Sequence, residues 1–389
     1  MVARLGRTGD VGVPRSARHP IVRRLVALIE ERSWHARFEQ AIAQVRAHDL
    51  EQMRAIVALQ DLIDFLDELV HWAPREQGDS RLVHDKLVEF HFLFDQPALA
   101  GLQSPVAPSA APAPLSSLSQ WIVDFARHWG SYLDTPASAR HVDSFRTDPA
   151  FRWDDYMPPP SGYLTFNQFF ARHTKPGRRP IDAPGDDDVV VAPADANFIG
   201  QWPVAADSSI LVADARLPLK GLSWSLAQLL QDSPYAARFA GGVVTHGALR
   251  TFDYHRWHAP LAGAVLEART IHGQAWLDVR VVESTTRGVA TRSLEAVEGT
   301  GYQFGQTRGL VVLQTSRGLV ACLPVGMAQV SSVVITAEVG AVLRKGEEMG
   351  YFQFGGSDFV MVFEACCRVA LDGREGVHVQ QGRRVGRCG

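Results

Sequence analysis

A serine preceded by two glycines near the end of the chain could act as a nucleophile. Gly355 and Gly356 directly precede Ser357. Two glycines let the backbone take conformations closed to other residues and let another group approach a backbone carbonyl. A serine hydroxyl next to such a carbonyl can attack it when a base removes its proton. The same three residues are also ordinary turn chemistry, so a plain β-turn stays open as an alternative.

Two histidines three residues apart are the candidate bases. They are His255 and His258, in the segment DYHRWHAP at residues 253–260. In extended or turning backbone they can point to different sides, which suits two different tasks. A neutral imidazole removes or returns protons near neutral pH. Two alternatives stay open: a histidine that only hydrogen-bonds in the core, and an HxxH metal pair, although no third ligand motif accompanies it.

Asp195 is the candidate partner for one of these imidazoles. It lies in the segment VAPADAN at residues 191–197. A carboxylate held against one imidazole nitrogen fixes the tautomer and stabilises the charged form. An aspartate just after a proline is also typical of a turn, and that interpretation stays open. The nearby acidic run at residues 186–188 is interpreted as a solvated loop.

The elements that must position these residues fall into two parts, which predicts an α+β fold. Residues 1–155 read as a helical N-terminal domain, with a Pro/Ala-rich linker at about 104–117 that cannot be helical throughout. Apolar residues three or four apart predict helices over residues 20–47, 51–72, 82–94 and 121–133. Residues 156–389 read as a β-rich catalytic domain, with expected strands at 189–192, 242–245, 276–282, 310–314, 329–336 and 359–363.

Composition excludes several classes of protein. The 389 residues are 46% hydrophobic, which is enough for a sizeable core. A formal charge of −3 gives no sign of a nucleic-acid partner. There is no apolar run near the roughly 20 residues that a membrane span needs, and no secretory h-region. Four cysteines fit neither a zinc pattern nor a disulfide framework, so we expect a soluble, cytoplasmic protein.

Five segments, taken in order, resemble the phosphatidylserine decarboxylase family of pyruvoyl-dependent enzymes. The resemblance covers about residues 160–364. DYHRWHAP and KGEEMGYFQFGGS are its most specific motifs in combination. The five segments are FNQFFARHTKPGRRPI (166–181), VAPADAN (191–197), LKGLSWSLAQLL (219–230), FDYHRWHAPLAG (252–263) and the long stretch from VGMAQVSS to FVMVFE (325–364).

The resemblance implies a self-cleaving proenzyme. Ser357 would attack the carbonyl of Gly356, the chain would break between residues 356 and 357, and the two chains would stay associated. The new end at 357 would be a pyruvoyl group, which forms a Schiff base with the substrate amine and accepts the electrons released with carbon dioxide, as pyridoxal phosphate does elsewhere. No pyridoxal phosphate and no metal is expected. By the same pattern His258 is the processing base, oriented by Asp195, and His255 is the proton donor after decarboxylation.

Three residues depart from the family pattern. Ala196 replaces the glycine of a PADG motif, and Asp358 follows the reactive serine where Thr or Ser is usual. A carboxylate beside the ketone could slow processing or help to position an amine, so Asp358 is a candidate substrate-binding residue. The third departure is Gln306, in QTRG, where many relatives carry the asparagine of an Asn-x-Arg motif, and Arg308 stands at the arginine position of that motif. It is either an anchor for a carboxylate or phosphate or a surface-loop arginine.

The helical extension favours one substrate class. With VGMAQVSS and GGS it is similar to the soluble branch that includes fungal L-tryptophan decarboxylases, which implies decarboxylation of an aromatic, tryptophan-like L-amino acid. Phosphatidylserine, converted to phosphatidylethanolamine, is the alternative substrate. A second alternative is an unprocessed, non-catalytic relative; a carrier domain, suggested by AEVGAVLRKGEEMG at 337–350, lacks a lysine at a hairpin tip. Peripheral membrane contact and a homo-oligomer both stay open.

Overall fold

The structure is a computed structural model that describes residues 18–78, 81–108, 113–211, 223–286, 289–297, 301–327 and 333–389. Parts of two quoted motifs, at residues 219–222 and 328–332, lie outside the described residues. So do the first 17 residues and positions 109–112 of the expected linker.

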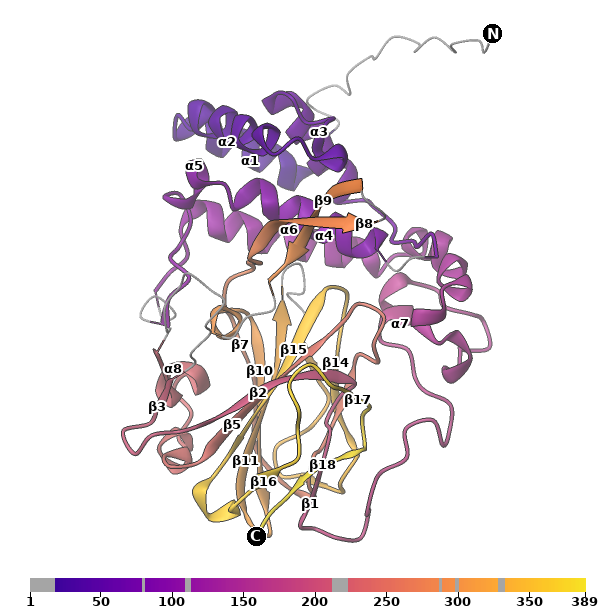
Figure 1. Ribbon diagram of the computed structural model, residues 1–389, viewed down its shortest axis with the longest axis vertical. Coiled ribbons are helices and arrows are strands. Elements are labelled where there is room, and N and C mark those ends of the chain that lie inside the picture. The colour runs from indigo at the N-terminus through magenta and orange to yellow at the C-terminus, as the bar shows by residue number, and fades with distance from the viewer. Residues whose placement is uncertain are drawn as a thin grey trace.

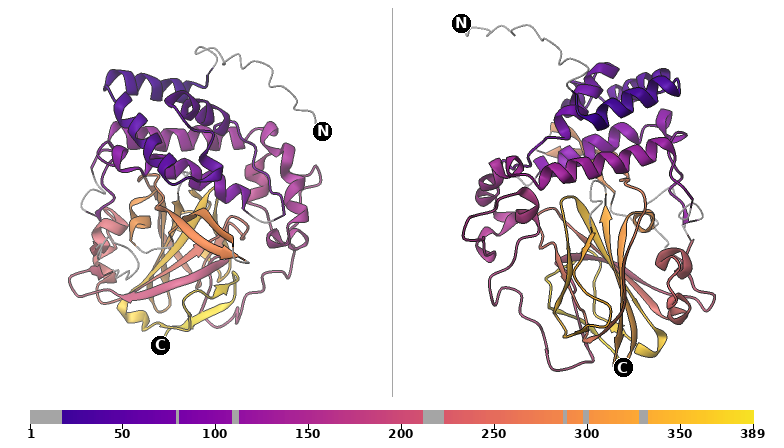
Figure 2. Two further views of the ribbon diagram at one scale, coloured as in Figure 1. Left: turned by 45° about the horizontal axis from the view of Figure 1, so that its top comes forward. Right: turned by 180° about the vertical axis from the view of Figure 1, so that it is seen from behind.

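Helices form a layer across one end of the β-rich part (Figures 1 and 2). Their apolar faces are buried, as Leu25 of the first helix and Phe38 of the second show. The pattern over residues 20–47 forms two helices, because Ser33 takes a positive φ of 55° between them. The α-helices of this layer are α1 (Pro20–Glu31), α2 (His35–Ala47), α3 (Leu59–Leu69), α4 (Leu82–Phe94), α5 (Pro97–Ala100) and α6 (Ser117–Leu133), and a 3₁₀ stretch, η4 (Pro136–Thr147), follows them.

Strands dominate the rest of the chain, with two short helices, α7 (Phe166–Phe170) and α8 (Leu226–Leu230). This arrangement confirms the expected α+β fold class. The strands are β1 (Val189–Val191), β2 (Ala196–Pro203), β3 (Ser209–Leu211), β4 (Ser223–Ser225), β5 (Val243–Leu249), β6 (Arg256–His258), β7 (Gly263–Ile271), β8 (Val279–Thr286), β9 (Val289–Ala296), β10 (Arg308–Thr315), β11 (Gly318–Met327), β12 (Val333–Ile335), β13 (Val342–Leu343), β14 (Glu348–Phe352), β15 (Gly356–Phe363), β16 (Ala370–Leu371), β17 (His378–Val379) and β18 (Arg384–Arg387).

The largest sheet has eight strands in the order β13-β7-β10-β11-β15-β5-β2-β17. A second sheet, β1-β18-β16, joins the C-terminal strands to the first strand, and a third, β12-β14-β6, carries the histidine segment. Strand β15 pairs antiparallel with β11 on one side and β5 on the other. In this register Ser357 lies opposite Gly326 and Leu249. The strand that carries the candidate nucleophile is therefore an interior strand.

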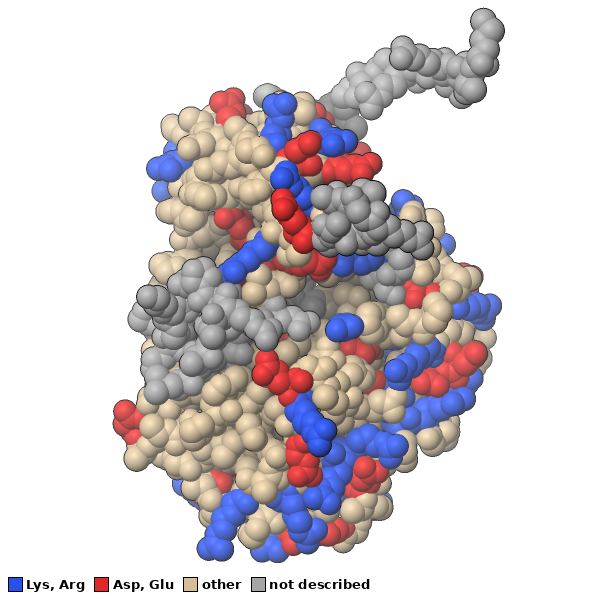
Figure 3. Space-filling view, viewed as in Figure 1, with Lys and Arg blue, Asp and Glu red and all other residues tan. Residues whose placement is uncertain are grey.

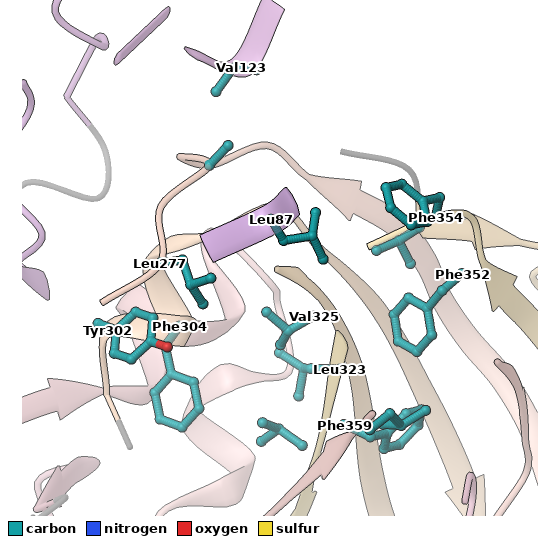
Figure 4. Close-up of a cluster of buried hydrophobic side chains, with 14 of the residues drawn as sticks. Leu87, Val123, Leu277, Tyr302, Phe304, Leu323, Val325, Phe352, Phe354 and Phe359 are labelled. Atoms are coloured by element: carbon teal, nitrogen blue, oxygen red, sulfur yellow. The ribbon is translucent and has the colours of Figure 1, made fainter. Parts of the chain in front are cut away.

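The helical layer and the sheets share one hydrophobic core. Figure 4 shows part of it, from Leu87 and Val123 of the helices to Leu323 of the sheet. The β8–β9 hairpin extends toward α4, and Arg81 bonds Glu295 of β9 at 2.9 Å. The ring of Trp129 packs 5.1 Å from that of Phe354, just before β15. The division into separate domains at residues 155 and 156 stays a prediction, since these contacts join the two parts closely.

The surface carries charges of both signs. On the face in Figure 3, basic and acidic side chains are intermingled, in keeping with the small formal net charge of −3. Within the described ranges, no helix combines the length and the apolar character that crossing a membrane requires.

Candidate active site

Ser357 is held in the first part of β15, directly after a glycine turn. Gly355 takes a φ of +140°, a left-handed conformation that favours glycine. Ser357 is only 1% exposed. Its hydroxyl Oγ lies 3.3 Å from Nδ1 of His255. The sheet therefore fixes the backbone of the nucleophile, while its side chain meets an imidazole from a distant part of the chain.

His255 is arranged so that its Nδ1 can accept a proton from Ser357. Its ring is fully buried and stacks on Phe170, with centroids 3.8 Å apart and planes at 19°. Nε2 lies 3.3 Å from the carbonyl oxygen of Thr251, which can only accept a hydrogen bond. Nε2 therefore carries the hydrogen, and the lone pair of Nδ1 faces the serine hydroxyl.

The surroundings of His255 keep its ring neutral. Burial, and next the positive charge of Arg172, lower the pKa of His255 to about 3. Arg172 is itself 2% exposed, with its guanidinium carbon 4.0 Å from the ring centre of Tyr156. Its Nη2 donates to the carbonyl of Phe252 at 2.8 Å. A neutral imidazole is the form that serves as a general base.

His258 lies three residues on, in β6, and has other partners. Its Nδ1 donates to the carbonyl of Gly346 at 2.9 Å, and its Nε2 lies 3.1 Å from the hydroxyl of Tyr254. Because Nδ1 carries the hydrogen, Nε2 accepts from the tyrosine. Burial raises the pKa of Tyr254 and lowers that of His258, so both groups stay neutral at ordinary pH.

Asp195 lies near His258 but is paired with an arginine. Its carboxylate accepts from Nε of Arg179 at 2.9 Å and from Nη2 at 2.5 Å, and the backbone N–H of Gln381 donates to it at 2.8 Å. The Arg179 and Asp195 side chains are each 3% exposed. The backbone N–H of His258 donates to the carbonyl of Pro193 at 2.8 Å, so the two segments do pack together.

The structure thus brings the expected residues into one region but pairs them differently. Ser357 contacts His255, not His258, and Asp195 bonds Arg179, not an imidazole. In the part of the chain that the structure describes, the expected hydrogen-bonded series Ser357–His258–Asp195 is not formed. The physical reason lies in β6, which turns the ring of His258 toward Gly346 and Tyr254.

The two candidate substrate-binding residues are both occupied inside the protein. Asp358 points to the face of β15 opposite to Ser357, because side chains alternate along a strand. Its Oδ2 lies 2.7 Å from Nε2 of His246, with side chains 5% and 1% exposed. Arg308 is 1% exposed and donates to the carbonyls of Gln228 and Leu229 at the end of α8. It is therefore not a surface-loop arginine, and its guanidinium caps a helix.

Sequence reasoning did not single out Arg179, Tyr254 or Phe170, although all three lie in the quoted motifs. The motif FFARHTKPGRRP supplies the ring that stacks on His255 and the guanidinium that holds Asp195. Nothing in the sequence indicated that Arg179 would pair with Asp195, because Asp182 lies nearer to it along the chain. Across the described ranges, no group of three or more His, Cys, Asp or Glu side chains is arranged to hold a metal ion.

Comparison with known proteins identifies relatives across this region. The family model "Phosphatidylserine decarboxylase" matches residues 166–387, more than half of the chain. Phosphatidylserine decarboxylase proenzyme 3 of Schizosaccharomyces pombe is 31% identical over 237 residues, which cover 60% of this chain and 22% of that protein. This chain therefore spans about a fifth of the length of that relative.

Two other relatives match over most of their own length. Decarboxylase iboD of Amanita muscaria is 29% identical over 65% of this chain and 79% of that protein. The phosphatidylserine decarboxylase proenzyme of Fusobacterium nucleatum is 28% identical over 64% of this chain and 73% of its own. The family match covers the same region as the β15 serine and its imidazole partner, and the chain belongs to the phosphatidylserine decarboxylase family.

Proposed function

We propose that the protein cleaves itself between Gly356 and Ser357 and then decarboxylates an L-amino acid, an aromatic, tryptophan-like one being favoured. The observation that supports self-cleavage best is the 3.3 Å approach of Ser357 Oγ to Nδ1 of His255. A buried serine, a neutral base and a preceding pair of glycines are the parts that an attack on the neighbouring carbonyl needs.

The residues support the following sequence of bond changes. His255 takes the proton of Ser357 Oγ, the oxygen attacks the carbonyl carbon of Gly356, and the peptide C–N bond breaks as the nitrogen receives the proton. In the resulting ester a base takes the Cα proton of residue 357 as the Cβ–O bond breaks, and this elimination frees the carboxylate of Gly356 and leaves dehydroalanine. Water then hydrolyses the dehydroalanine at 357, releasing ammonia and leaving a ketone. In this scheme His255 takes the role that the resemblance gives to His258.

We further propose that the two chains stay together after cleavage. The small chain would begin at residue 357, and its strand β15 pairs with β11 and β5 of the large chain. Strand β17 pairs with β2, and β18 pairs with β1. Releasing the small chain would break all of these ladders, so dissociation requires unfolding of the sheet.

Decarboxylation of the substrate would use the same residues around position 357 as self-cleavage. A pyruvoyl group supplies an electron sink for the electrons that carbon dioxide leaves behind. His255 remains next to position 357 and is the group that we propose returns a proton to the product. Tyr254 lies just before β6 and His258 is its last residue, and the hydrogen bond between their side chains holds the segment that carries His255.

The choice of substrate rests on different support for each candidate. The helical N-terminal layer resembles the branch that acts on free aromatic amino acids. Phosphatidylserine is the alternative, because the named relatives from Schizosaccharomyces pombe and Fusobacterium nucleatum are phosphatidylserine decarboxylase proenzymes. An unprocessed relative without activity is the second alternative.

The test is an intact mass spectrum followed by parallel assays with tryptophan and phosphatidylserine. Two chains split between Gly356 and Ser357, the small one lacking its N-terminal amine, are expected. Ser357→Ala should give one full-length, inactive chain, while Ser131→Ala, a matched change in α6, should process normally. One full-length chain from the unmodified sequence, or an active Ser357→Ala variant, overturns the proposal.

A further inference from the structure

A polar cavity of about 440 Å³ lies beside the end of β5. Arg250, which follows β5 directly, contributes to its wall, and Leu249 just before it is the ladder partner of Ser357. Neither Ser357 nor His255 is among the described residues that line this cavity. The cavity is therefore next to the nucleophile but separate from it, and the proposed chemistry gives it no task.

The acidic side chains in this cavity are already neutralised. Asp195 is bound by the guanidinium of Arg179, as described above. Asp253 accepts from Nε2 of His378 at 2.9 Å. That hydrogen bond is the main reason why the pKa of His378 is raised, which favours its charged form. The two carboxylates thus leave no free negative charge facing the cavity.

Three donors remain without a protein acceptor. The guanidinium groups of Arg152 and Arg250 line the cavity, and neither has a carboxylate partner among the residues described. The backbone of Arg152 is left-handed, with φ 44° and ψ 47°. Residues other than glycine adopt this conformation where the surrounding structure imposes it. Asn197 is 6% exposed, lines the same cavity and has no side-chain hydrogen bond within the described ranges.

We propose that this cavity binds a phosphate group, held by the guanidinium groups of Arg152 and Arg250 and by the amide of Asn197. Two guanidinium forks and an amide offer more donors than the two oxygens of a carboxylate can use, whereas a phosphate presents three or four acceptor oxygens. The net positive charge of the walls favours the anion. The phosphate can come from a lipid headgroup or from free phosphate, since both offer the same oxygens.

Binding is tested first, on the purified protein and independently of its activity. Isothermal titration with inorganic phosphate and with glycerophosphoserine, at constant ionic strength, should show saturable binding of at least one of them. Arg152→Gln and Arg250→Gln should each weaken it at least about tenfold, the scale of one lost charged hydrogen bond. Arg250→Lys, which keeps the charge, should weaken it less. Arg127→Gln, at an exposed arginine of α6, is the control.

The possible outcomes distinguish a lipid headgroup from free phosphate, and both from the absence of a phosphate site. Tighter binding of glycerophosphoserine, with a raised KM for phosphatidylserine vesicles in the two Gln variants, assigns the cavity to a headgroup. Tighter binding of inorganic phosphate, with KM unchanged, assigns it to free phosphate. No saturable binding of either probe, or equal affinity in the Arg152→Gln/Arg250→Gln double variant, overturns the proposal. The mass spectrum reports self-cleavage separately, so failure of one proposal does not imply failure of the other.

Discussion

Nδ1 of His255 lies 3.3 Å from Oγ of Ser357, although 102 positions separate the two residues in the chain. The contact is made because β15 and the segment before β6 meet at the same point, with Phe170 stacked on the outer face of the imidazole. Its hydrogen on Nε2 is directed to Thr251. The chain thus presents a neutral base to a serine that sits inside a sheet.

Exchanging each histidine for glutamine should separate their tasks. His255→Gln removes the group that contacts Ser357, so we expect self-cleavage to slow at least about a hundredfold, the scale of general-base catalysis. His258→Gln removes a contact to Tyr254 and Gly346, so cleavage should persist. The fraction of cleaved chain, measured on gels over time after synthesis, checks this. Cleaved His255→Gln beside uncleaved His258→Gln would restore the base role to His258.

The pH dependence of self-cleavage follows from the lowered pKa of His255. An imidazole with a pKa of about 3 is neutral at pH 5.5 and at pH 8. The cleavage rate should therefore change less than about twofold between these values. A histidine with an ordinary pKa near 6.5 would lose about tenfold of its neutral form over the same range. Pulse-labelled protein transferred to buffers of each pH gives the rate, and a tenfold fall at pH 5.5 would contradict a buried neutral base.

Asp195 should contribute more to the free energy of unfolding than Asp155, the other acidic partner of Arg179. Asp195→Asn removes the negative partner of a buried arginine, a kind of change that costs about 3–5 kcal/mol. Asp155→Asn is the matched control, because Asp155 contacts the same Arg179 at 3.6 Å and is more exposed. It should cost less than about 1 kcal/mol. Urea unfolding of both variants in a Ser357→Ala background compares single, uncleaved chains, and equal losses would argue against a dominant Asp195–Arg179 pair.

Asp358 should act on the stability of the sheet rather than on cleavage. Its carboxylate meets His246 on the face of β15 away from Ser357. Asp358→Asn should therefore leave the cleavage rate within about twofold and lower the free energy of unfolding by about 1–3 kcal/mol, as for a buried hydrogen bond to a charged group. A double-mutant cycle with His246→Gln measures their coupling. Asp372→Asn, at an exposed ion pair, is the control. Markedly faster cleavage in Asp358→Asn would show instead that the carboxylate opposes the reaction.

Local sequence patterns predicted many helices and strands, because the formation of these elements depends largely on residues that are close in the chain. The helix expected over residues 82–94 is α4 with the same bounds. The strand expected over 359–363 begins earlier, at Gly356, because glycines give no strand signal although the ladders with β11 and β5 include it. The strand expected from 276 begins at Val279, since Trp276 packs on Tyr302 instead.

Pairings between distant segments could not be predicted in the same way. The motifs identified the residue types of the site, but the choice between His255 and His258 depends on where β6 begins and how its ladder with β14 is registered. The role of Arg308 was equally open, because only the fold places the end of α8 over its guanidinium. The hydrogen bonds between Arg179 and Asp195 could not be predicted either, because the two residues are 16 positions apart and no local pattern places them together.

The position of β15 means that residues 357–389, once cleaved from the rest of the chain, supply an interior strand of the sheet as a separate peptide. A large fragment that ends at residue 356 would lack the strand between β11 and β5 and the partners of β1 and β2. The chain is therefore suited to fragment complementation, in which a synthetic peptide inserts as the missing strand. Semisynthesis of that peptide would place a chosen carbonyl at position 357 without any cleavage reaction.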